Sequence, residues 1–315
     1  MKQKICMLGG SGFVGGHLTR RLVDEGYTVR VITRRPERHR ELTVLPTVEM
    51  VACDINDVQA LQAQFADCDV VINLIAVLNE QRAGDFTKLH VELPRRVAQA
   101  CTAAGVSRLL HMSSLNADAK GGSSEYLRSK GEGEDSVHRV DGLHVTSFRP
   151  AVIFGPNDDF FNRFATLLSL SPLALPLACP DARFAPVYVG DVVDAFMKAL
   201  EDRSTYGQRY DLCGPKVYTL SQLVEFTARA IGSGCAVVGL NDKLSRLQAR
   251  IMEFVPGKPF TRDNYLSMKR DCVSDNNGLL LLGIEPTPME GVVSNMLRPR
   301  EVRARFDFFR RAARR

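Results

Sequence analysis

One stretch near the N-terminus decides the fold class: Gly9-Gly10-Ser11-Gly12-Phe13-Val14-Gly15. It follows the apolar run 4–8, which has the pattern of a buried strand, and it opens a helical pattern in which Val14, Leu18 and Leu22 share one face. Because glycine has no Cβ, the chain can turn tightly here and its backbone can lie against a pyrophosphate group. The N-terminus of the helix adds free N–H groups and partial positive charge. The stretch therefore predicts a phosphate-binding loop between a strand and a helix, in preference to a purely structural glycine turn.

The alternation of strand and helix patterns continues through residue 148. Five further runs are short, rich in Val, Ile and Leu, and apolar on both faces, as strands between two helical layers are. These runs are 28–32, 48–52, 70–75, 108–112 and 144–148. Helical patterns at 86–101 and 126–138 lie between them. This order predicts an α/β protein built on a doubly wound parallel sheet, that is, a Rossmann fold.

The pattern changes after residue 148, where the chain becomes rich in Pro, Phe and Leu without a clean period. Strand and helix patterns resume at 186–189, 191–200, 209–213 and 220–231. We therefore expect a dinucleotide-binding Rossmann domain at 1–155, to which 186–204 returns. A smaller interleaved substrate domain is expected at 156–185 and 205–297, followed by a basic tail at 298–315.

The apolar segment 167–179 is too short for a transmembrane helix, which needs about 18 uninterrupted apolar residues. Pro172 and Pro176 also interrupt it. We expect this segment to form a loop over a pocket or an apolar contact surface. As the lining of a pocket, it favours an apolar small-molecule substrate such as a quinone or an isoprenoid.

Composition and charge exclude several classes of protein. The chain has 315 residues, of which 45% are hydrophobic and 24% charged, as in an ordinary soluble globular protein. The tail holds eight arginines, Glu301 and Asp307, so its net charge is +6. Since the whole chain has a net charge of +5, the rest carries −1 and offers no broad positive surface for nucleic acid. The eight cysteines contain no C-x-x-C pair, and no metal site is expected. Because the N-terminus has no signal-peptide layout, we expect a cytoplasmic protein.

The tail can form a basic amphipathic helix. Its apolar residues would share one stripe surrounded by arginines, and they are Val302, Phe306, Phe309 and Ala313. Such a helix is typical of an element that docks on an anionic membrane or on a partner protein. The alternative is a solvated terminus with no partner.

Residues after the second and third strands bear on the choice of dinucleotide. NAD-binding proteins usually have an acidic residue after the second strand, which binds the ribose 2′-hydroxyl. This chain has Arg34 and Arg35 there, and Arg34 can pair with a 2′-phosphate through forked hydrogen bonds. The position therefore favours NADP(H) over NAD(H), unless both arginines are solvated surface charge. Asp54, after the third strand, is either an acceptor for the adenine amino group or the N-cap of the next helix.

A second group of polar residues follows the fifth strand. Tyr126 and Lys130 are four residues apart on a predicted helix, so both side chains can point into one site. The Lys130 ammonium is expected to lower the pKa of the Tyr126 phenol and to make it a proton donor or acceptor near neutral pH. Ser113 and Ser114 end the strand at the crevice where doubly wound folds bind their ligands.

Together these motifs resemble those of the extended or atypical short-chain dehydrogenase/reductase superfamily, whose members include NAD(P)-dependent epimerases and dehydratases. The resemblance covers nearly the whole chain. It implies that Tyr126 exchanges a proton, Lys130 holds the nicotinamide ribose, and Ser114 binds the substrate carbonyl, while Ser113 only caps the strand end. The residues that it implies for the dinucleotide are Gly9, Gly10, Ser11, Gly12, Phe13, Val14, Gly15, Arg34, Asp54, Ile55, Ala76, Tyr126, Lys130, Pro150 and Ile153.

Four stretches resemble one branch of this superfamily, and they are 73–75, 126–130, 186–192 and 261–263. That branch includes the nucleotide-binding accessory subunit of mitochondrial respiratory complex I and its bacterial homologues. It implies contact with a respiratory complex at the periphery of the inner membrane, with the basic tail as one means of contact. It also implies an NADPH that is held structurally rather than turned over.

Three positions depart from the superfamily. Leu115 and Asn116 stand where sugar-nucleotide dehydratases have an Asp-Glu pair, so dehydratase activity is not expected. His90 replaces an asparagine of the fourth helix, and we interpret it as a hydrogen-bonding residue rather than a catalytic base. The sequence thus favours an NADP(H)-dependent oxidoreductase acting on a carbonyl or hydroxyl group of an apolar small molecule. The alternative is a structural or assembly protein of a respiratory complex, and a sugar-nucleotide epimerase is a more distant one.

Overall fold

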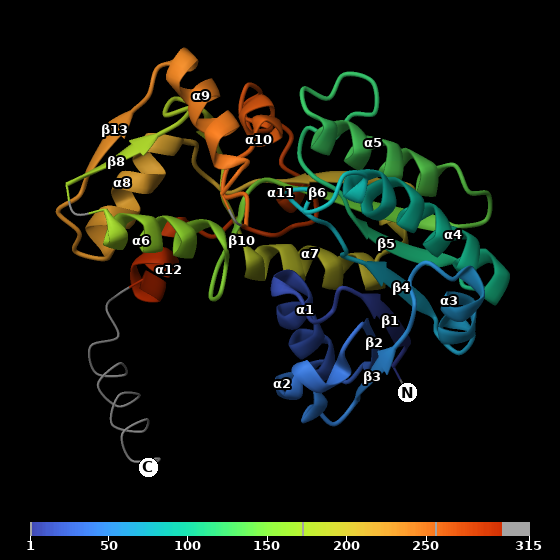
Figure 1. The fold of residues 1–315 in the computed structure, drawn as a ribbon. Helices are drawn as coiled ribbons and strands as arrows, with labels where there is room; N and C mark the ends of the chain where they lie inside the picture. Colours follow the sequence, from blue (N-terminus) through green and yellow to red (C-terminus); the bar gives the residue numbers. More distant parts are fainter. Residues whose placement is uncertain (1, 172, 256, 298–315) are drawn as a thin grey trace, which may run out of the picture.

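The computed structural model describes residues 2–171, 173–255 and 257–297. Its main element is a seven-stranded parallel sheet with the strand order β11-β6-β5-β4-β1-β2-β3 (Figure 1). The strands are β1 (Lys4–Leu8), β2 (Thr28–Thr33), β3 (Val48–Ala52), β4 (Val70–Asn73), β5 (Arg108–Met112), β6 (His144–Pro150) and β11 (Arg209–Leu212). The order reverses between β1 and β4, where a doubly wound fold opens its ligand crevice. The predicted Rossmann fold is confirmed.

Helices cover both faces of this sheet because its strands are apolar on both sides. One face packs against α1 (Phe13–Asp24), α7 (Val189–Glu201) and α11 (Gly278–Leu281). The other face packs against α3 (Val58–Phe65), α4 (Leu93–Ala104) and α5 (Glu125–His138). A π-helical segment, η2 (Thr87–Glu92), leads into α4, and the short α2 (Arg40–Thr43) connects β2 to β3. The sheet therefore has a separate apolar core on each side.

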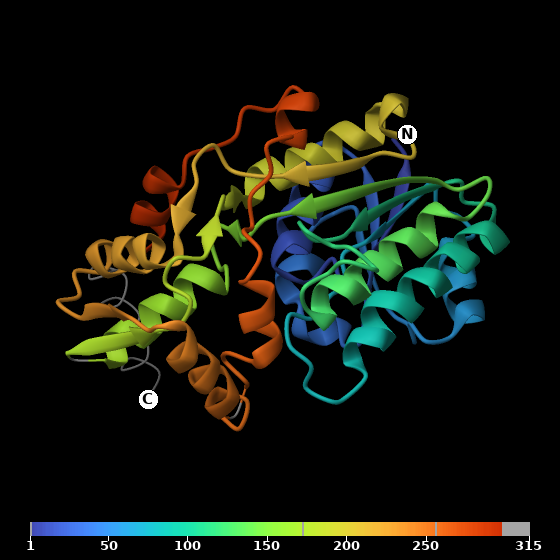
Figure 2. The ribbon, with the colours of Figure 1, turned by 90° about the horizontal axis from the view of Figure 1, so that it is seen from above.

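A second group of elements, which we call the C-terminal unit, has its own apolar core around Phe154, Phe161 and Leu223. Its helices are α6 (Phe160–Leu170), α8 (Leu220–Ala230), α9 (Asp242–Met252), α10 (Arg262–Ser267) and α12 (Met289–Leu297). Its strand pairs are β10 (Val187–Tyr188) with β7 (Ile153–Phe154), β12 (Tyr218–Thr219) with β9 (Arg183–Phe184), and β13 (Ala236–Gly239) with β8 (Ala174–Leu177). Figure 2 shows the arrows of β6 and β11 pointing from the sheet toward this unit, so it lies beside the C-terminal ends of the strands.

Two observations differ from the expectations for the C-terminal half. Strand β11 pairs with β6, so the main sheet takes its edge strand from a range that the sequence placed in the smaller domain. The expectation of a loop at 167–179 is wrong, because Leu167–Leu170 completes α6 and residues 174–177 form β8. In β8, Leu175 and Leu177 are buried while Pro176 is exposed. A two-strand sheet tolerates this proline because a strand at a sheet edge can lack one N–H donor.

The structure contains eight free cysteines. Among its described helices, none is both long enough and apolar enough to cross a membrane. The basic tail at 298–315, and the amphipathic stripe predicted on it, lie outside the described residues.

Candidate functional site

The glycine loop joins β1 to α1 at the point where the strand order reverses. Gly9 has φ of +81°, a conformation that only glycine adopts without strain. A Cβ on Gly15 would lie 2.2 Å from the Gly9 carbonyl oxygen, so α1 can approach the loop only because Gly15 has no side chain. Gly12 is the N-cap of α1 and has no side chain to bind the N–H groups of the first turn. These N–H groups fit the pyrophosphate of a dinucleotide, and a cap side chain would fill the place that it needs. Ser11, Phe13 and Val14 are partly exposed beside them.

The ends of β2 and β3 carry the residues predicted to bind the adenosine half. Arg34 and Arg35 are exposed and form no ion pair with any residue that the structure describes. Asp54 accepts hydrogen bonds from the backbone N–H (2.9 Å) and the side chain (2.8 Å) of Asn56. It does not cap α3, because Asp57 does so, and the N-cap alternative for Asp54 is therefore wrong. Ile55 is half-buried and packs against the second core.

His90 connects the loop after β4 to α5. Its Nε2 accepts the Val77 N–H at 3.1 Å, and its Nδ1 lies 3.0 Å from the Ser129 hydroxyl. Ser129 donates its own hydrogen to the Tyr126 carbonyl, so Nδ1–H is the donor and His90 is neutral. Burial, with the nearby Lys130 charge, lowers the pKa of His90 to about 3. The interpretation of His90 as a hydrogen-bonding residue is confirmed, and the connection holds the loop that exposes Ala76.

Gly133 explains how the His90 segment comes so close to α5. A Cβ at Gly133 would lie 1.7 Å from the His90 carbonyl oxygen. Any other residue would therefore push η2 away from α5 and break the contact between His90 and Ser129. This requirement was not predicted from the sequence, because a glycine inside a helix is otherwise only mildly destabilising.

Tyr126, Lys130 and Ser114 meet at the end of β5. The Lys130 ammonium donates to the Met112 carbonyl at 2.7 Å, and the side chain is buried. The Tyr126 ring packs edge-on against the rings of Phe86 (5.9 Å between centroids) and His90 (5.5 Å). The Ser114 hydroxyl lies beside the Tyr126 phenol and favours its ionised form. The structure thus brings the three predicted catalytic residues into one place.

The protonation of this group differs from the sequence expectation. Burial raises the pKa of the Tyr126 phenol, and the contribution from Ser114 only partly opposes this. Burial also lowers the pKa of Lys130 to about 8, while the Glu134 carboxylate acts in the opposite direction. The prediction that Lys130 lowers the pKa of Tyr126 is therefore wrong, because the ammonium is directed at the Met112 carbonyl and the phenol is desolvated. At neutral pH the tyrosine is a protonated hydroxyl.

Pro150 is the last residue of the adjacent strand, β6, and Ile153 follows it three residues later. The Leu115 N–H donates to the Pro150 carbonyl at 3.0 Å, which ties the loop carrying Ser114 to the end of β6. Ile153 begins β7 and packs against the core that also contains α1. Pro150 thus lies beside the loop that carries Ser114, on the strand next to β5.

Asp263 is a residue of this site whose role sequence reasoning missed. It lies on α10 of the C-terminal unit, and its carboxylate accepts the N–H groups of Glu125 (2.7 Å) and Tyr126 (3.1 Å). The Ser267 hydroxyl donates to the Ser124 hydroxyl at 2.7 Å nearby. The C-terminal unit therefore caps the helix that carries Tyr126. The only signal in the sequence was the resemblance of the stretch 261–263 to other proteins.

Glu134 is a second missed residue. It lies one turn beyond Lys130, is fully buried, and binds the Arg149 guanidinium (2.6 Å) together with that of Arg209. Burial acts to raise the pKa of Glu134, but its bonds to Arg149 outweigh this and hold the pKa below its usual range. The carboxylate is therefore charged, and it joins α5 to β6 and β11.

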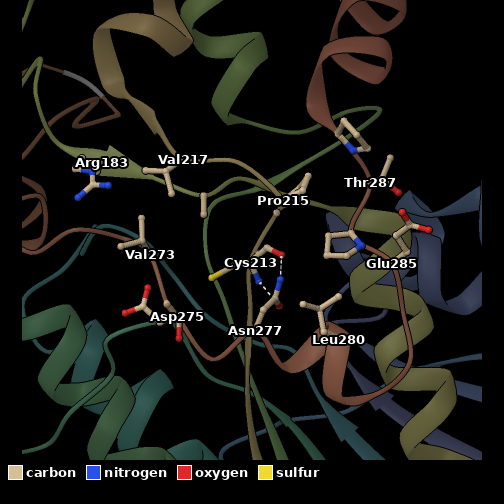
Figure 3. Close-up of a pocket in the computed structure, with 15 residues that line it drawn as sticks. Arg183, Cys213, Pro215, Val217, Val273, Asp275, Asn277, Leu280, Glu285 and Thr287 are labelled. Carbon is tan, nitrogen blue, oxygen red and sulfur yellow. Dashed lines mark hydrogen bonds between the residues drawn. The ribbon is translucent and has the colours of Figure 1, made fainter.

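A separate cavity of about 860 Å³ lies past the end of β11 (Figure 3). Its wall includes Val217, Val273 and Leu280, with Asp275 and Glu285 as acidic groups. Asn277 bonds both the N–H (3.2 Å) and the carbonyl (2.7 Å) of Cys213, as the dashed lines in Figure 3 show. None of the residues predicted for the dinucleotide or for catalysis lines this cavity.

Comparison with known proteins relates the chain to enzymes and to a respiratory subunit. Residues 5–213 match the NAD dependent epimerase/dehydratase family. The chain is 31% identical over 296 residues to the mouse mitochondrial NADH dehydrogenase [ubiquinone] 1 alpha subcomplex subunit 9, covering 90% of this chain and 77% of that protein. It is 32% identical over 190 residues to the ceramide reductase of Caulobacter vibrioides, covering 59% of this chain and 57% of that protein. Among solved structures, the epimerase Mth375 of Methanothermobacter thermautotrophicus superposes with a TM-score of 0.75 at 18% identity, covering 98% of this chain and 94% of that one.

Proposed function

The chain belongs to the NAD-dependent epimerase/dehydratase family, and on that basis we propose that it is an NADP(H)-dependent reductase of a carbonyl group on an apolar small molecule. The observation that carries the proposal is the meeting of Tyr126, Lys130 and Ser114 around a phenol whose pKa is raised by burial. A phenol that stays protonated at neutral pH is suited to give its proton to a carbonyl oxygen. This favours reduction of a carbonyl over oxidation of an alcohol.

The bound dinucleotide would supply the hydride, and the chain supplies binding, orientation and the proton. The glycine loop and the first turn of α1 would hold the pyrophosphate through backbone N–H groups. Arg34 is exposed at the end of β2, unpaired by any described residue, and would bind the 2′-phosphate that distinguishes NADP(H). Asp54, Ile55 and Ala76 would border the remainder of the cofactor.

At the substrate, Tyr126 donates its proton to the carbonyl oxygen, and the Ser114 hydroxyl donates a hydrogen bond to the same oxygen. Both act where negative charge develops, which is where fixed donors accelerate a reaction most. Lys130, whose ammonium also donates to the Met112 carbonyl, would hold the nicotinamide ribose. His90 and Asp263 do not touch the substrate, and they hold the helix that carries Tyr126.

The surroundings of Leu115 and Asn116 support reduction over elimination. Leu115 is buried, and the Asn116 amide donates to the Asp271 carbonyl at 2.8 Å, so neither position offers an acid or a base. The similarity to a ceramide reductase supports an apolar substrate. A sugar-nucleotide epimerase remains the more distant alternative, because the superposition on an epimerase at this low identity establishes the fold alone.

A second candidate function is a structural, nucleotide-loaded subunit or assembly protein of a respiratory complex. It is favoured by the similarity to a subunit of mitochondrial NADH dehydrogenase over nearly the whole chain. In this role NADPH would stabilise the fold by binding only to the native state. The same dinucleotide site would serve, and Tyr126 would turn over no substrate.

One experiment separates the two functions. Purified protein is loaded with NADPH, and the loss of the reduced nicotinamide is followed in the presence of a long-chain ketone or a short-chain quinone. We expect oxidation that falls by about 10²–10⁴ in Tyr126→Phe, while the affinity for NADPH is unchanged. Tyr206→Phe is the control, because Tyr206 stacks on His144 at the opposite edge of the sheet. Tightly bound NADPH that neither acceptor oxidises would favour the structural role.

The choice of dinucleotide has its own test. Arg34→Ala is expected to weaken NADPH binding by about tenfold or more, as loss of a charge-assisted hydrogen bond does, and to leave NADH binding unchanged. Isothermal titration of both dinucleotides measures the difference. Equal losses for NADPH and NADH would mean that Arg34 does not bind the 2′-phosphate, and absence of any affinity for either would remove both candidate functions.

A further inference from the structure

Helix α9 buries small residues and exposes large apolar ones, which is the reverse of an ordinary surface helix. The side that packs on the protein consists of small residues, Ser245 and Ala249, which are 1% and 0% exposed. Its large apolar residues point outward instead, and Leu244, Leu247 and Ile251 are between 47% and 54% exposed. A helix that packs on one core normally buries such residues and exposes the small and polar ones.

The outward apolar face continues beyond the last turn of α9. Phe254 is 86% exposed, and Val255 next to it is 40% exposed. By helical spacing, Leu244, Leu247 and Ile251 form one stripe that leads into these two residues. We call these five residues the α9 face. The helix lies at the outer edge of the C-terminal unit in Figure 1 and in Figure 2, away from the main sheet.

Hydrogen bonds on the buried side fix this orientation. The Ser245 hydroxyl accepts the Cys179 N–H at 3.0 Å and donates to the Leu240 carbonyl at 3.2 Å. The Gln248 amide donates to the Pro176 carbonyl at 3.0 Å, which ties the helix to β8. A rotation that buried the leucines would break all of these bonds. The outward direction of the apolar residues is therefore a property of the fold.

The charges on α9 show what kind of surface could cover this face. Lys243, Arg246 and Arg250 lie along one border of the stripe, are exposed, and form no ion pair with a described residue. The acidic groups of this region are already neutralised, because Asp242 binds Lys269 and Glu253 binds Arg262 at 2.9 Å. The border of the α9 face thus carries three uncompensated positive charges. Its complement is a surface that is apolar and anionic together.

We propose that the α9 face is a membrane-binding surface that lies in the interface of an anionic bilayer. An apolar stripe with Lys and Arg beside it is the arrangement of interfacial helices, whose apolar side enters the acyl boundary while the basic side chains meet lipid phosphates. A short connection joins α9 to α10, which caps the helix of Tyr126 through Asp263. The α9 face is thereby connected to the candidate site. Membrane binding itself does not depend on the proposed reductase activity.

The test uses the full-length protein and vesicle flotation. Vesicles of phosphatidylcholine with phosphatidylglycerol are expected to carry the protein, and vesicles of phosphatidylcholine alone to carry much less. Leu247→Ser/Ile251→Ser is expected to lower the partition coefficient by more than about tenfold, because binding scales with the apolar area that enters the interface. Arg246→Gln/Arg250→Gln is expected to remove most of the dependence on phosphatidylglycerol.

The controls and the contrary outcomes are set by the structure. Val44→Ser/Leu281→Ser removes two apolar residues that are 78% and 64% exposed on other elements, and it is expected to bind vesicles like the wild type. The basic tail is present in every variant, so a selective loss reports on α9. Failure of the wild type to bind anionic vesicles, or equal binding by the α9 variants, would overturn the proposal. A variant that instead converts a dimer to a monomer in light scattering would show that a second copy covers this face, which would also overturn it.

Discussion

A surface helix normally buries its apolar residues and exposes its charged ones, and helices α5 and α9 depart from this rule in opposite ways. Helix α5 buries charged residues, with Lys130 2% and Glu134 0% exposed, whereas α9 exposes its leucines and buries a serine and an alanine. On α5 each buried charge has a partner, the Met112 carbonyl for Lys130 and two guanidinium groups for Glu134. On α9, Leu244, Leu247 and Ile251 remain 47% to 54% exposed in the described chain.

The difference shows how each departure from local rules is compensated. Buried charge is tolerated where other groups of the same chain satisfy it, and such networks are costly to break. Exposed apolar surface has no compensation inside the molecule, so it is a property that only a second surface can explain. Local inconsistencies of this kind are expected at functional sites. One helix therefore belongs to the internal chemistry of the protein and the other to its surroundings.

Among substitutions of buried polar groups, the largest expected loss of stability comes from breaking the network on α5. Glu134→Gln removes a buried negative charge and leaves the guanidinium groups of Arg149 and Arg209 without it. We expect the free energy of unfolding to fall by about 3 kcal/mol, the lower end for a broken buried pair, because both arginines keep some access to water. Urea denaturation measures the loss. Asp135→Asn is the control, since its pairs with Arg139 and Arg209 lie at the surface, and we expect less than about 1 kcal/mol.

The next prediction is that His90 makes the free energy of unfolding depend on pH. Burial lowers the pKa of His90 to about 3, below its usual value of about 6.5, so the unfolded chain takes up this proton first. Stability that is present above about pH 6.5 should therefore be lost as the pH falls toward 3, by up to about 1.4 kcal/mol per pH unit for one histidine. His90→Gln is expected to reduce this slope, measured by urea denaturation at several pH values. An unchanged slope would mean that other buried histidines, such as His138, account for all of it.

The strands were the part of the fold that could be predicted most closely. The first, third and fifth have the predicted bounds. For the first and fifth the reason is that a parallel strand covered on both faces is a short apolar run with sharp ends. The glycine loop was predicted for a similar reason, since the close approach at Gly15 allows no other residue. Local sequence is sufficient to predict an element when the constraint on that element comes from residues near it in the chain.

The rest of the site depends on contacts that local sequence does not contain. Asp263 and the Glu125 N–H that it caps are 138 residues apart, and no periodicity relates them. The pKa of Tyr126 depends on burial and on the Ser114 hydroxyl beside the phenol, neither of which the spacing of Tyr and Lys specifies. No helix was predicted at the position of α9, and the spacing of its apolar residues does not show on which side the body of the protein lies.

A smaller effect is expected where the C-terminal unit meets α5. Asp263→Ala leaves the N–H groups of Glu125 and Tyr126 without their acceptor, while Ser124 still caps the N–H of Leu127. Loss of a helix cap costs about 0.5–2 kcal/mol, and we expect the unfolding free energy to fall within that range. If Asp263 positions Tyr126, kcat for carbonyl reduction should fall while the Kd for NADPH stays the same. Asp263→Asn keeps an acceptor oxygen for only one of the two N–H groups and should recover part of the stability, and a loss as large as that of Asp263→Ala would argue against a capping role.

The smallest effect is expected at Leu247, and it is measured by making the same substitution, leucine to alanine, on both helices. Leu247→Ala on α9 removes a side chain that is 50% exposed, so the unfolding free energy should change by less than about 0.5 kcal/mol. Leu127→Ala on α5 removes one that is 4% exposed, and there we expect a loss of about 2–5 kcal/mol. Urea denaturation of both variants, without vesicles, gives the comparison directly. A loss at Leu247 as large as that at Leu127 would show that the α9 face is covered in solution by the protein itself. A near-zero change would instead mean that Leu247 stabilises nothing in the isolated chain, which leaves contact with another surface as the reason for its outward position.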